Sequence, residues 1–290
     1  MEHSARTGLG RVFPAGLMLL WLLPACFIHH PVTGVVPGQS ETEDVTAILL
    51  AGSVFAFSGG SEALPVSGAS LWMRGDRLET DFRGTAIWYD ASGNNRFLAG
   101  NGINRVENAV ANRPAALCNG TSMVLRSITG SELIQTDQGT TYLVLRQAGG
   151  KADNIAYQYY ASSGNDNFRA RLSSADALTF EFGENDATGT ISTAQPAGWD
   201  DNFHVVELYR SGTNGEIVSD GAVLTATTFS STVNVSDVGI FYICGGHVSS
   251  TRFLGEIAEM IVYPTALSGA DRSAVRCHLS NKYSLAATGC

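Results

Sequence analysis

Short apolar runs separated by turn residues fill the chain from residue 70 onward, and no long helical pattern appears before its end. The runs are rich in β-branched and aromatic residues, while Gly, Asn, Asp, Ser and Pro lie between them, as in strands joined by turns. The sequence therefore predicts an all-β fold of two packed antiparallel sheets. The clearest predicted strands are Thr141–Arg146, Ala156–Tyr160, Leu178–Phe182, Phe203–Tyr209 and Gly239–Cys244.

Two further signals are local. Asp220-Gly221 lies between apolar runs, and such a pair readily adopts the positive φ angles of a two-residue hairpin turn. Near the end, the run Gly255–Tyr263 reads as a strand that stops at Pro264, whose ring nitrogen cannot donate to a sheet. A capping-box pattern then predicts one helix, with apolar residues at helical spacing. These residues are Ser268 and Asp271, followed by Val275, Leu279 and Tyr283.

Residues 1–28 are predicted to form a signal peptide. Arg6 and Arg11 precede the apolar stretch Phe13–Ile28, which is shorter than the roughly 20 apolar residues of a membrane-spanning helix. The segment before Phe27 is similar to a bacterial lipobox, which makes Cys26 a candidate for lipidation. Ordinary cleavage nearby, or no cleavage, is the alternative, because Phe27 is bulkier than the residues usual there. The leader predicts export, with an extracellular or cell-envelope location.

Residues 29–66 are predicted to hold a tether and a first strand. Residues 29–44 are rich in Pro, Gly, Ser and Thr and have no periodicity, as in a linker. The apolar segment Val45–Phe57 is too short to span a bilayer and predicts a buried first strand that pairs with the closing strand. The folded domain is predicted to occupy residues 67–290.

The amino-acid composition and the net charge limit the classes of binding partner that the chain is expected to have. Only 16% of the residues are charged, there are 32 glycines, and the formal net charge is −9. This balance is typical of turn-rich extracellular β proteins. The negative charge opposes nucleic-acid backbones and anionic lipid surfaces, so neither is a predicted partner, and membrane contact is expected only through a lipid anchor.

Four cysteines besides Cys26 predict disulfides in an exported chain, and four cysteines allow three pairings. Cys277 and Cys290 are close enough in sequence for a bridge that pins the tail to the helix. Cys118 would then pair with Cys244, and we favour this pairing while the other two remain open. The cysteines lack the close spacing of a structural zinc site.

Several motifs occur in the order seen in one family. The chain resembles bacterial laminin G-like domains of the concanavalin A-like lectin/glucanase superfamily over roughly residues 70–285. One departure is the Phe-Asp-Gly usual in the family, which is replaced around Met123–Arg126. The resemblance implies a jelly-roll sandwich with one C-terminal helix, and the family mostly binds rather than catalyses. The motifs are Leu71–Asp76, Trp88–Asn94, Asn112–Pro114 with Asn119-Gly120, Trp199–Arg210 before Asp220-Gly221, and Phe253–Leu285.

Catalysis is not predicted. Glucanases of the superfamily place carboxylates on one strand face by a Glu-x-Asp-x-Glu alternation, which this chain lacks. Glu256 and Glu259 would point to opposite faces of a regular strand. The chain also lacks the Gly-x-Ser-x-Gly pattern of a serine hydrolase.

Binding candidates come from aromatic and oxygen-bearing side chains. Tyr157, Tyr159 and Trp199 could stack on a sugar ring, although alternate aromatics in a strand also serve as core. Related domains often hold calcium with Asp and Asn oxygens, which makes Asp90 and Asn94 the candidate ligands. Both residues could instead simply close a turn.

The sequence thus predicts an exported, non-catalytic, lectin-like protein that binds a carbohydrate or another surface polymer. The alternative is a structural or adhesion module, contacting a surface protein and lacking a small ligand. A polysaccharide-degrading enzyme is the third hypothesis.

Overall fold

The computed structural model describes residues 49–50, 53–54, 62–119, 123–148, 154–161, 167–173, 177–183, 189–229, 238–248 and 252–290. The chain divides into two units, residues 1–60 and residues 61–290. The predicted signal peptide, the lipidation candidate Cys26 and the predicted tether of residues 29–44 lie outside the described residues. They stay predictions.

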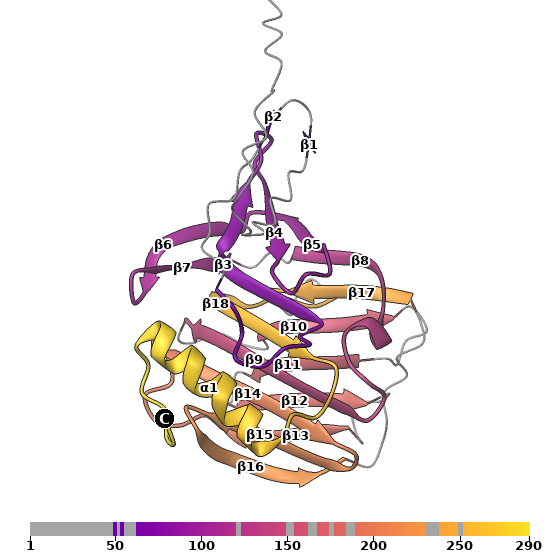
Figure 1. Ribbon diagram of the computed structural model, residues 1–290, viewed down its shortest axis with the longest axis vertical. Helices are drawn as coiled ribbons and strands as arrows, with labels where there is room; N and C mark the ends of the chain where they lie inside the picture. Colours follow the sequence, from indigo (N-terminus) through magenta and orange to yellow (C-terminus); the bar gives the residue numbers. More distant parts are fainter. Residues whose placement is uncertain are drawn as a thin grey trace, which may run out of the picture. The chain divides into compact units, whose positions relative to one another are not determined.

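The larger unit is built from strands and one C-terminal helix (Figure 1). A 3-10 turn at Gly130–Glu132 and the helix α1 at Gly269–Tyr283 are its described helical segments. Its described strands are β3 (Leu71–Thr80), β4 (Thr85–Asp90), β5 (Phe97–Asn101), β6 (Asn104–Val110), β7 (Arg113–Asn119), β8 (Met123–Thr129), β9 (Gln138–Gln147), β10 (Asn154–Ala161), β11 (Asn167–Ser173), β12 (Ala177–Gly183), β13 (Thr190–Ala194), β14 (Phe203–Ser211), β15 (Asn214–Ser219), β16 (Ala222–Thr228), β17 (Val238–Ile243) and β18 (Leu254–Tyr263).

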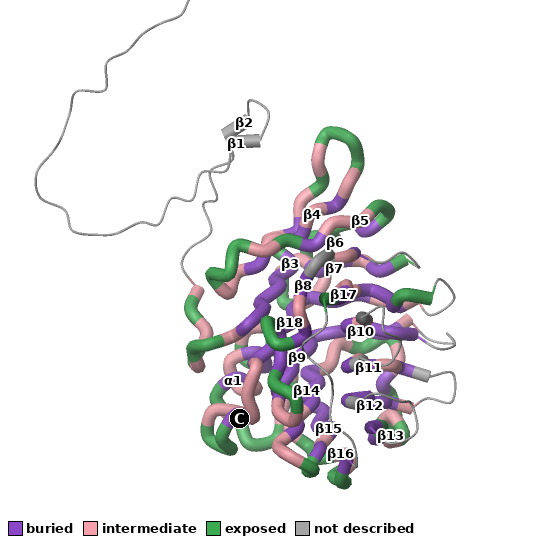
Figure 2. Tube along the Cα trace, turned by 90° about the vertical axis from the view of Figure 1, so that its right-hand side faces the viewer, coloured by how far each residue is buried: buried purple, intermediate pink, exposed green. Residues whose placement is uncertain are grey.

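These strands form a sandwich, as predicted, because one antiparallel path folds into two layers. One layer runs β13, β12, β11, β10, β17 and β8, and the other runs β3, β18, β9, β14, β15 and β16. β4 and β5 connect the layers through the pair Ala99 and Val124, and β7 and β6 extend from β18. Figure 2 shows the buried segments concentrated in the strands, with the exposed ones at turns. The fold class is therefore confirmed.

The predicted first strand is corrected by the described residues of the smaller unit. β1 (Leu49–Leu50) pairs antiparallel with β2 (Ser53–Val54), so the two segments belong to one hairpin rather than to one strand. The closing strand β18 pairs instead with β3, β7 and β9. The apolar character of this segment correctly predicted β structure. It carries no information on where the chain reverses direction, so the turn between β1 and β2 was missed.

The main core lies between the two layers, and aromatic rings fill its centre. The ring of Phe168 stacks on that of Tyr159 with centroids 5.3 Å apart, and it lies 6.3 Å from Phe182 and 6.4 Å from Phe241. The opposite layer contributes aliphatic side chains such as Leu143. Aromatic pairs of this kind stabilise a core by about 0.5–1.5 kcal/mol each beyond their burial.

Helix α1 covers the outer face of the layer that contains β9, β14 and β18 (Figure 1). The hydroxyl oxygen of Ser268 accepts a hydrogen bond of 3.2 Å from the backbone N–H of Asp271, so the predicted cap is confirmed. Val275, Leu279 and Tyr283 are buried against this layer, as their spacing predicted. The helix therefore forms because a local cap and an apolar stripe agree.

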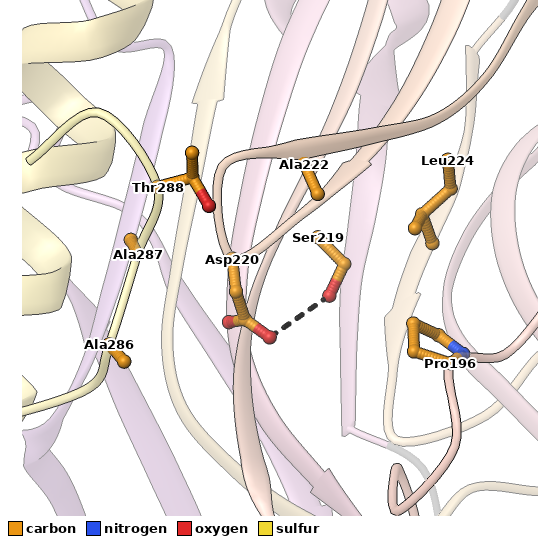
Figure 3. Close-up of a pocket in the computed structure, with 8 residues that line it drawn as sticks. All are labelled: Pro196, Ser219, Asp220, Ala222, Leu224, Ala286, Ala287 and Thr288. Atoms are coloured by element: carbon orange, nitrogen blue, oxygen red, sulfur yellow. Dashed lines mark hydrogen bonds between the residues drawn. The ribbon is translucent and has the colours of Figure 1, made fainter.

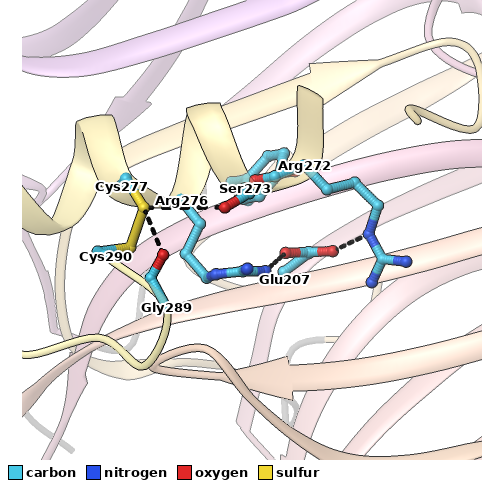
Figure 4. Close-up of a disulfide and its surroundings, with 8 residues drawn as sticks. Glu207, Arg272, Ser273, Arg276, Cys277, Gly289 and Cys290 are labelled. Carbon is cyan, nitrogen blue, oxygen red and sulfur yellow. Dashed lines mark hydrogen bonds and ion pairs between the residues drawn. A yellow bond between two sulfur atoms is a disulfide. The ribbon is translucent and has the colours of Figure 1, made fainter. Parts of the chain in front are cut away.

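Buried carboxylates also hold the helix. Glu207 on β14 accepts hydrogen bonds from Arg272 and, at 2.9 Å, from Arg276 (Figure 4). Glu259 on β18 lies 2.6 Å from the Lys282 ammonium, and the indole N–H of Trp72 donates to it at 2.5 Å. Each buried anion is thus paired with a cation of the helix.

A bulge in β18 corrects the expected directions of Glu256 and Glu259. Glu256 pairs with Arg146 and Glu259 pairs with Val144, so Ala258 is the extra residue. Paired residues share a face, and Val144 and Arg146 lie two apart, so both glutamates lie on the same face. Glu256 forms an ion pair of 2.6 Å with Arg146, and both carboxylates are therefore engaged in holding the fold.

Both disulfides follow the favoured pairing. Cys118 at the end of β7 is bonded to Cys244, which follows β17, with the two Cα atoms 5.3 Å apart. Cys277 on α1 is bonded to Cys290 in the tail, with a Cα–Cα distance of 5.1 Å (Figure 4). One bridge joins the two layers, and the other fastens the C-terminal tail to the helix.

Glu62 makes a pH-dependent contact with helix α1 and with β3. Its carboxylate lies 2.9 Å from Lys282, 3.2 Å from Arg74 and 3.4 Å from His278. Burial alone would raise the pKa of Glu62, but these three neighbours outweigh it and hold the pKa below its ordinary value of 4.5. A carboxylate with a depressed pKa stabilises the fold above its unfolded pKa and loses that contribution as the pH falls through the folded value.

We therefore expect Glu62→Gln to lower the free energy of unfolding by about 1 kcal/mol at neutral pH. The difference from wild type should shrink as the pH falls below about 4. Urea unfolding at a series of pH values measures it. The control is Glu107→Gln, which alters a carboxylate whose side chain is 63% exposed. An E62Q deficit that persisted at acid pH would contradict the assignment.

Candidate functional site

The aromatic residues of β10 alternate between the core and the surface. Tyr157 and Tyr159, predicted as sugar contacts, are both 0% exposed and belong to the core between the layers. Tyr160 is half-buried and lies on the other face. The structure thus corrects the choice of residues while keeping the strand, because alternation separates two faces without telling which one is covered.

Trp199 is also buried, at 2% exposure, and it packs rather than presents a ring to solvent. Its indole stacks on the imidazole of His204 with centroids 4.1 Å apart. The two ring nitrogens of His204 face the backbone oxygen of Trp199 at 3.1 Å and the carboxylate of Asp220 at 2.6 Å. Both of these partners are hydrogen-bond acceptors, so they hold the ring in place from two sides.

A depression of about 640 Å³ lies beside the Asp220-Gly221 turn (Figure 3). The turn has the predicted positive φ angles, +48° and +81°, and joins β15 to β16. The carboxylate of Asp220 already accepts hydrogen bonds from Ser219 and Val205. Apart from Asp220, the residues that line the depression are small or apolar, and none of them is aromatic. The lining residues are Pro196, Ser219, Asp220, Ala222, Leu224, Ala286, Ala287 and Thr288.

The C-terminal tail closes one side of this depression, and Gly221 makes room for it. The backbone N–H of Thr288 donates to the carbonyl of Asp220 at 2.8 Å. A Cβ atom on Gly221 would overlap the carbonyl of Thr288. We expect Gly221→Ala to destabilise the protein by about 1–3 kcal/mol and to release the tail.

Hydrogen exchange of residues 284–290 measures that release. The matched control is Gly84→Ala, whose φ of +82° is almost the same but whose Cβ would meet nothing within 4 Å. Backbone strain alone should destabilise both variants, whereas only G221A should speed exchange in the tail. Equal exchange in the two variants would show that the tail does not rest on the hairpin.

The predicted calcium ligands lie in a hydrogen-bonded turn. One carboxylate oxygen of Asp90 accepts from the backbone N–H groups of Trp72 and Ser92, each at 2.8 Å, and the other accepts from the Ser92 hydroxyl at 2.7 Å. The amide of Asn94 donates to the carbonyl of Ser70 at 2.9 Å. These hydrogen bonds are the contacts that the structure describes for Asp90 and Asn94, and calcium binding at this turn stays a prediction.

The outer face of the β17, β10, β11 and β12 layer carries a row of polar side chains. Strand register pairs Tyr242 with Gln158, Gln158 with Arg169, Arg169 with Glu181, and Glu181 with Thr190. Directly paired residues share a face, and their neighbours along each strand point into the core. The row therefore crosses the layer on the side away from the core.

A second row runs beside the first. It contains Arg252, Ile155, Arg171, Thr179 and Ser192, again in register. The hydroxyl groups of Thr179 and Ser192 lie 3.0 Å apart. The two rows place guanidinium, carboxylate, amide and hydroxyl groups on one face of the layer, where Gln158 is 0%, Glu181 5% and Thr179 7% exposed.

An aromatic stack lies next to these rows. The exposed imidazole of His247 stacks on the ring of Tyr160, with centroids 3.8 Å apart and planes 6° from parallel. The backbone N–H of His247 donates to the side-chain oxygen of Gln158 at 3.1 Å, which fixes the loop above the strand. Burial and the nearby charge of Arg169 lower the pKa of His247, so the ring is neutral at pH 7.

Glu181 links the two arginines of β11. It forms an ion pair with Arg169, and one of its oxygens lies 3.9 Å from Arg171. The side chain of Arg171 is 35% exposed, whereas that of Arg169 is 11% exposed. Solvent therefore reaches the guanidinium of Arg171, whereas that of Arg169 is mostly buried and held by Glu181. We call this surface the polar face, defined by Gln158, Tyr160, Arg169, Arg171, Glu181 and His247.

Sequence reasoning missed most of the polar face, although one signal was present. The alternation Phe168, Arg169, Ala170, Arg171 and Leu172 separates a core face from a charged face. The contribution of His247 could not be found that way, because it depends on a loop that folds back over β10.

Within the described part of the chain, no cluster of three or more His, Cys, Asp or Glu side chains is placed to hold a metal ion. No described helix is long and apolar enough to cross a membrane.

Comparison with known proteins identifies the fold. No protein-family model matches the sequence, and no curated protein matches it. The structure is similar to the binding domain of botulinum neurotoxin serotype G, with a TM-score of 0.54 and 10% identity over 73% of this chain and 51% of that chain. It is also similar to Trypanosoma rangeli sialidase, with a TM-score of 0.54 and 14% identity over 76% of this chain and 34% of that one.

A third similar structure is domain 4 of AbnA, a GH43 extracellular arabinanase from Geobacillus stearothermophilus, solved in complex with arabinotriose. The TM-score is 0.50 and the identity 13%, over 72% of this chain and 97% of that domain. Identities this low show a shared fold. The larger unit of this chain is therefore a β-sandwich with the fold of these domains.

Proposed function

We propose that the chain is an exported, non-catalytic protein that binds a carbohydrate or a related surface polymer through the polar face. One observation carries the proposal: the exposed imidazole of His247 stacks on the half-buried ring of Tyr160, on the face that also carries the 35% exposed guanidinium of Arg171. A sugar offers an apolar ring face for stacking and hydroxyl groups for hydrogen bonds, and this surface matches both. The leader supports a location outside the cell or in its envelope.

Two further points support this proposal. The family resemblance of the sequence, to laminin G-like domains, is to a group that mostly binds. The similar domain of the arabinanase was solved with arabinotriose, so a sandwich of this architecture accommodates an oligosaccharide.

A glycan array with the full-length protein tests the proposal, and we expect binding to at least one class of glycan. Tyr160→Ala should weaken that binding about tenfold or more, because it removes the ring on which His247 stacks. The matched control is Phe82→Ala, which removes an aromatic that is 87% exposed on another part of the body. No binding to any glycan, or equal binding by Y160A and wild type, would overturn the proposal.

Calcium is included as a second arm of the same assay. A chelator abolishes binding if calcium at Asp90 and Asn94 orders the site, and it changes nothing if the turn depends only on its hydrogen bonds.

One observation supports the alternative hypothesis of an adhesion module: the aromatic ring of Phe82 is 87% exposed. The carboxylate of Asp81 accepts hydrogen bonds from the backbone N–H groups of Arg83 and Thr85, each at 2.8 Å, so this exposed ring is held on an ordered turn. Loss of surface attachment in F82A, with an empty array, would favour adhesion.

A further inference from the structure

We propose that the Cys277–Cys290 bridge is a redox-sensitive latch. A dithiol reductant opens it in the folded protein, and its opening releases residues 286–290 from the Asp220-Gly221 hairpin. This device goes beyond the proposed function and does not depend on what the polar face binds.

The two disulfides differ in their access to solvent. Cys118 is 1% exposed and Cys244 is 0% exposed, and both lie in the core between the layers. Cys290 is exposed, and Cys277 is half-buried on helix α1 (Figure 4). A thiolate must reach a sulfur atom to open a disulfide, so access decides which bridge reacts. A reductant in solution therefore reaches the Cys277–Cys290 bridge while the bridge in the core stays closed.

The opening reaction is a thiol–disulfide exchange. One thiolate of the dithiol attacks the sulfur of Cys290, the S–S bond breaks, and Cys277 leaves as a thiolate. The second thiolate of the reductant then attacks the mixed disulfide and releases Cys290. Each released thiolate takes up a proton. The bridge thus gains two electrons and two protons, and the dithiol is oxidised to its own disulfide.

Little besides the bridge holds the tail against the hairpin. Residues 286–289 are Ala, Ala, Thr and Gly, which have little apolar surface to bury where they line the depression (Figure 3). Among the hydrogen bonds of the described residues, one joins this segment to the hairpin, from the Thr288 N–H to the Asp220 carbonyl at 2.8 Å. A single backbone hydrogen bond at a surface contributes little net stability. The bridge is therefore what keeps the segment docked.

The chain before this segment is held independently of the bridge. The backbone N–H of Leu285 donates to the carbonyl of Ser280 at 2.9 Å, and Ser284 ends the helix in the left-handed conformation, with a φ of +53°. The side chain of Leu285 packs on the apolar cluster beneath helix α1. Release is therefore expected to begin after Leu285.

The first test is graded treatment of the folded, full-length protein with dithiothreitol in the absence of denaturant. Free thiols are then alkylated and identified by peptide mass spectrometry. We expect the Cys277 and Cys290 thiols to be labelled at dithiothreitol concentrations at least about tenfold lower than those that label the buried pair.

The second test is hydrogen exchange before and after this selective reduction. The Thr288 amide should exchange at least about tenfold faster in the reduced protein, whereas the Leu285 amide should not change. The double variant C277A/C290A, without reductant, should match the reduced wild type. Dithiothreitol should cause no further change at Thr288 in this variant, which separates opening of the bridge from any other effect of the reductant.

Two results would overturn the inference. Labelling of both pairs at the same dithiothreitol concentration would mean that the bridges do not differ in access. Protection of the Thr288 amide that persisted after reduction would mean that the tail stays docked without the bridge. Neither result bears on glycan binding, so the latch and the proposed function can fail independently.

Discussion

Replacing Glu207 with Ala is expected to lower the free energy of unfolding by about 3–5 kcal/mol. The Glu207 side chain is 0% exposed and lies between Arg272 and Arg276 of helix α1. Burial alone would lower the pKa of Arg272, but Glu207 and Glu216 outweigh it and hold that pKa above its ordinary value. Removing the carboxylate leaves two partly buried cations without their shared partner, and that is the origin of the large effect.

Urea unfolding measures the loss, and Glu216→Ala is the control. Glu216 also pairs with Arg272, at 2.6 Å, but its side chain is 29% exposed. Water replaces such a partner at little cost, so E216A should lose about 1 kcal/mol or less. If E207A and E216A were equally stable, packing of Val275 and Leu279 would hold the helix without help from the buried ion pairs.

Removal of the Cys118 to Cys244 bridge should produce the second large effect. The double variant C118A/C244A is expected to lose about 2–5 kcal/mol, because the bridge restricts the unfolded chain across a long loop. The two residues are 126 positions apart, and both are buried in the core between the layers. Chemical unfolding of the purified variant, compared with the wild type, gives the value.

The second bridge provides the comparison. Cys277 and Cys290 are 13 positions apart, so their bridge closes a much shorter loop. The chain-entropy estimate is about 5 kcal/mol for the long loop and about 3 kcal/mol for the short one. A larger loss in C277A/C290A than in C118A/C244A would mean that docking of the tail, rather than closure of the loop, dominates the stability.

Signals that act within a few residues predicted the structure well. The cap at Ser268, the stop at Pro264 and the turn at Asp220-Gly221 each depend on backbone chemistry that the local sequence determines. The bridge between Cys277 and Cys290 was favoured because the two residues are close in sequence. The pairing of Cys118 with Cys244, 126 positions apart, was favoured only as the remaining pair, with the alternatives left open.

Features that depend on partners far away in sequence were not predictable. Which face of β10 is covered depends on the opposite layer, so Tyr157 and Tyr159 were chosen where Tyr160 is the outward residue. The bulge at Ala258 moved Glu256 and Glu259 to one face because β9 sets the register. The rows of the polar face require five strand pairings at once, which a single sequence does not reveal.

The contact between Glu62 and helix α1 closes the larger unit on itself. Glu62 is the first described residue of this unit, and its ion pair with Lys282 fastens it to the last helix. The polar face is on the outer side of the other layer, so loss of this contact at acid pH would free the start of the unit without reaching that face.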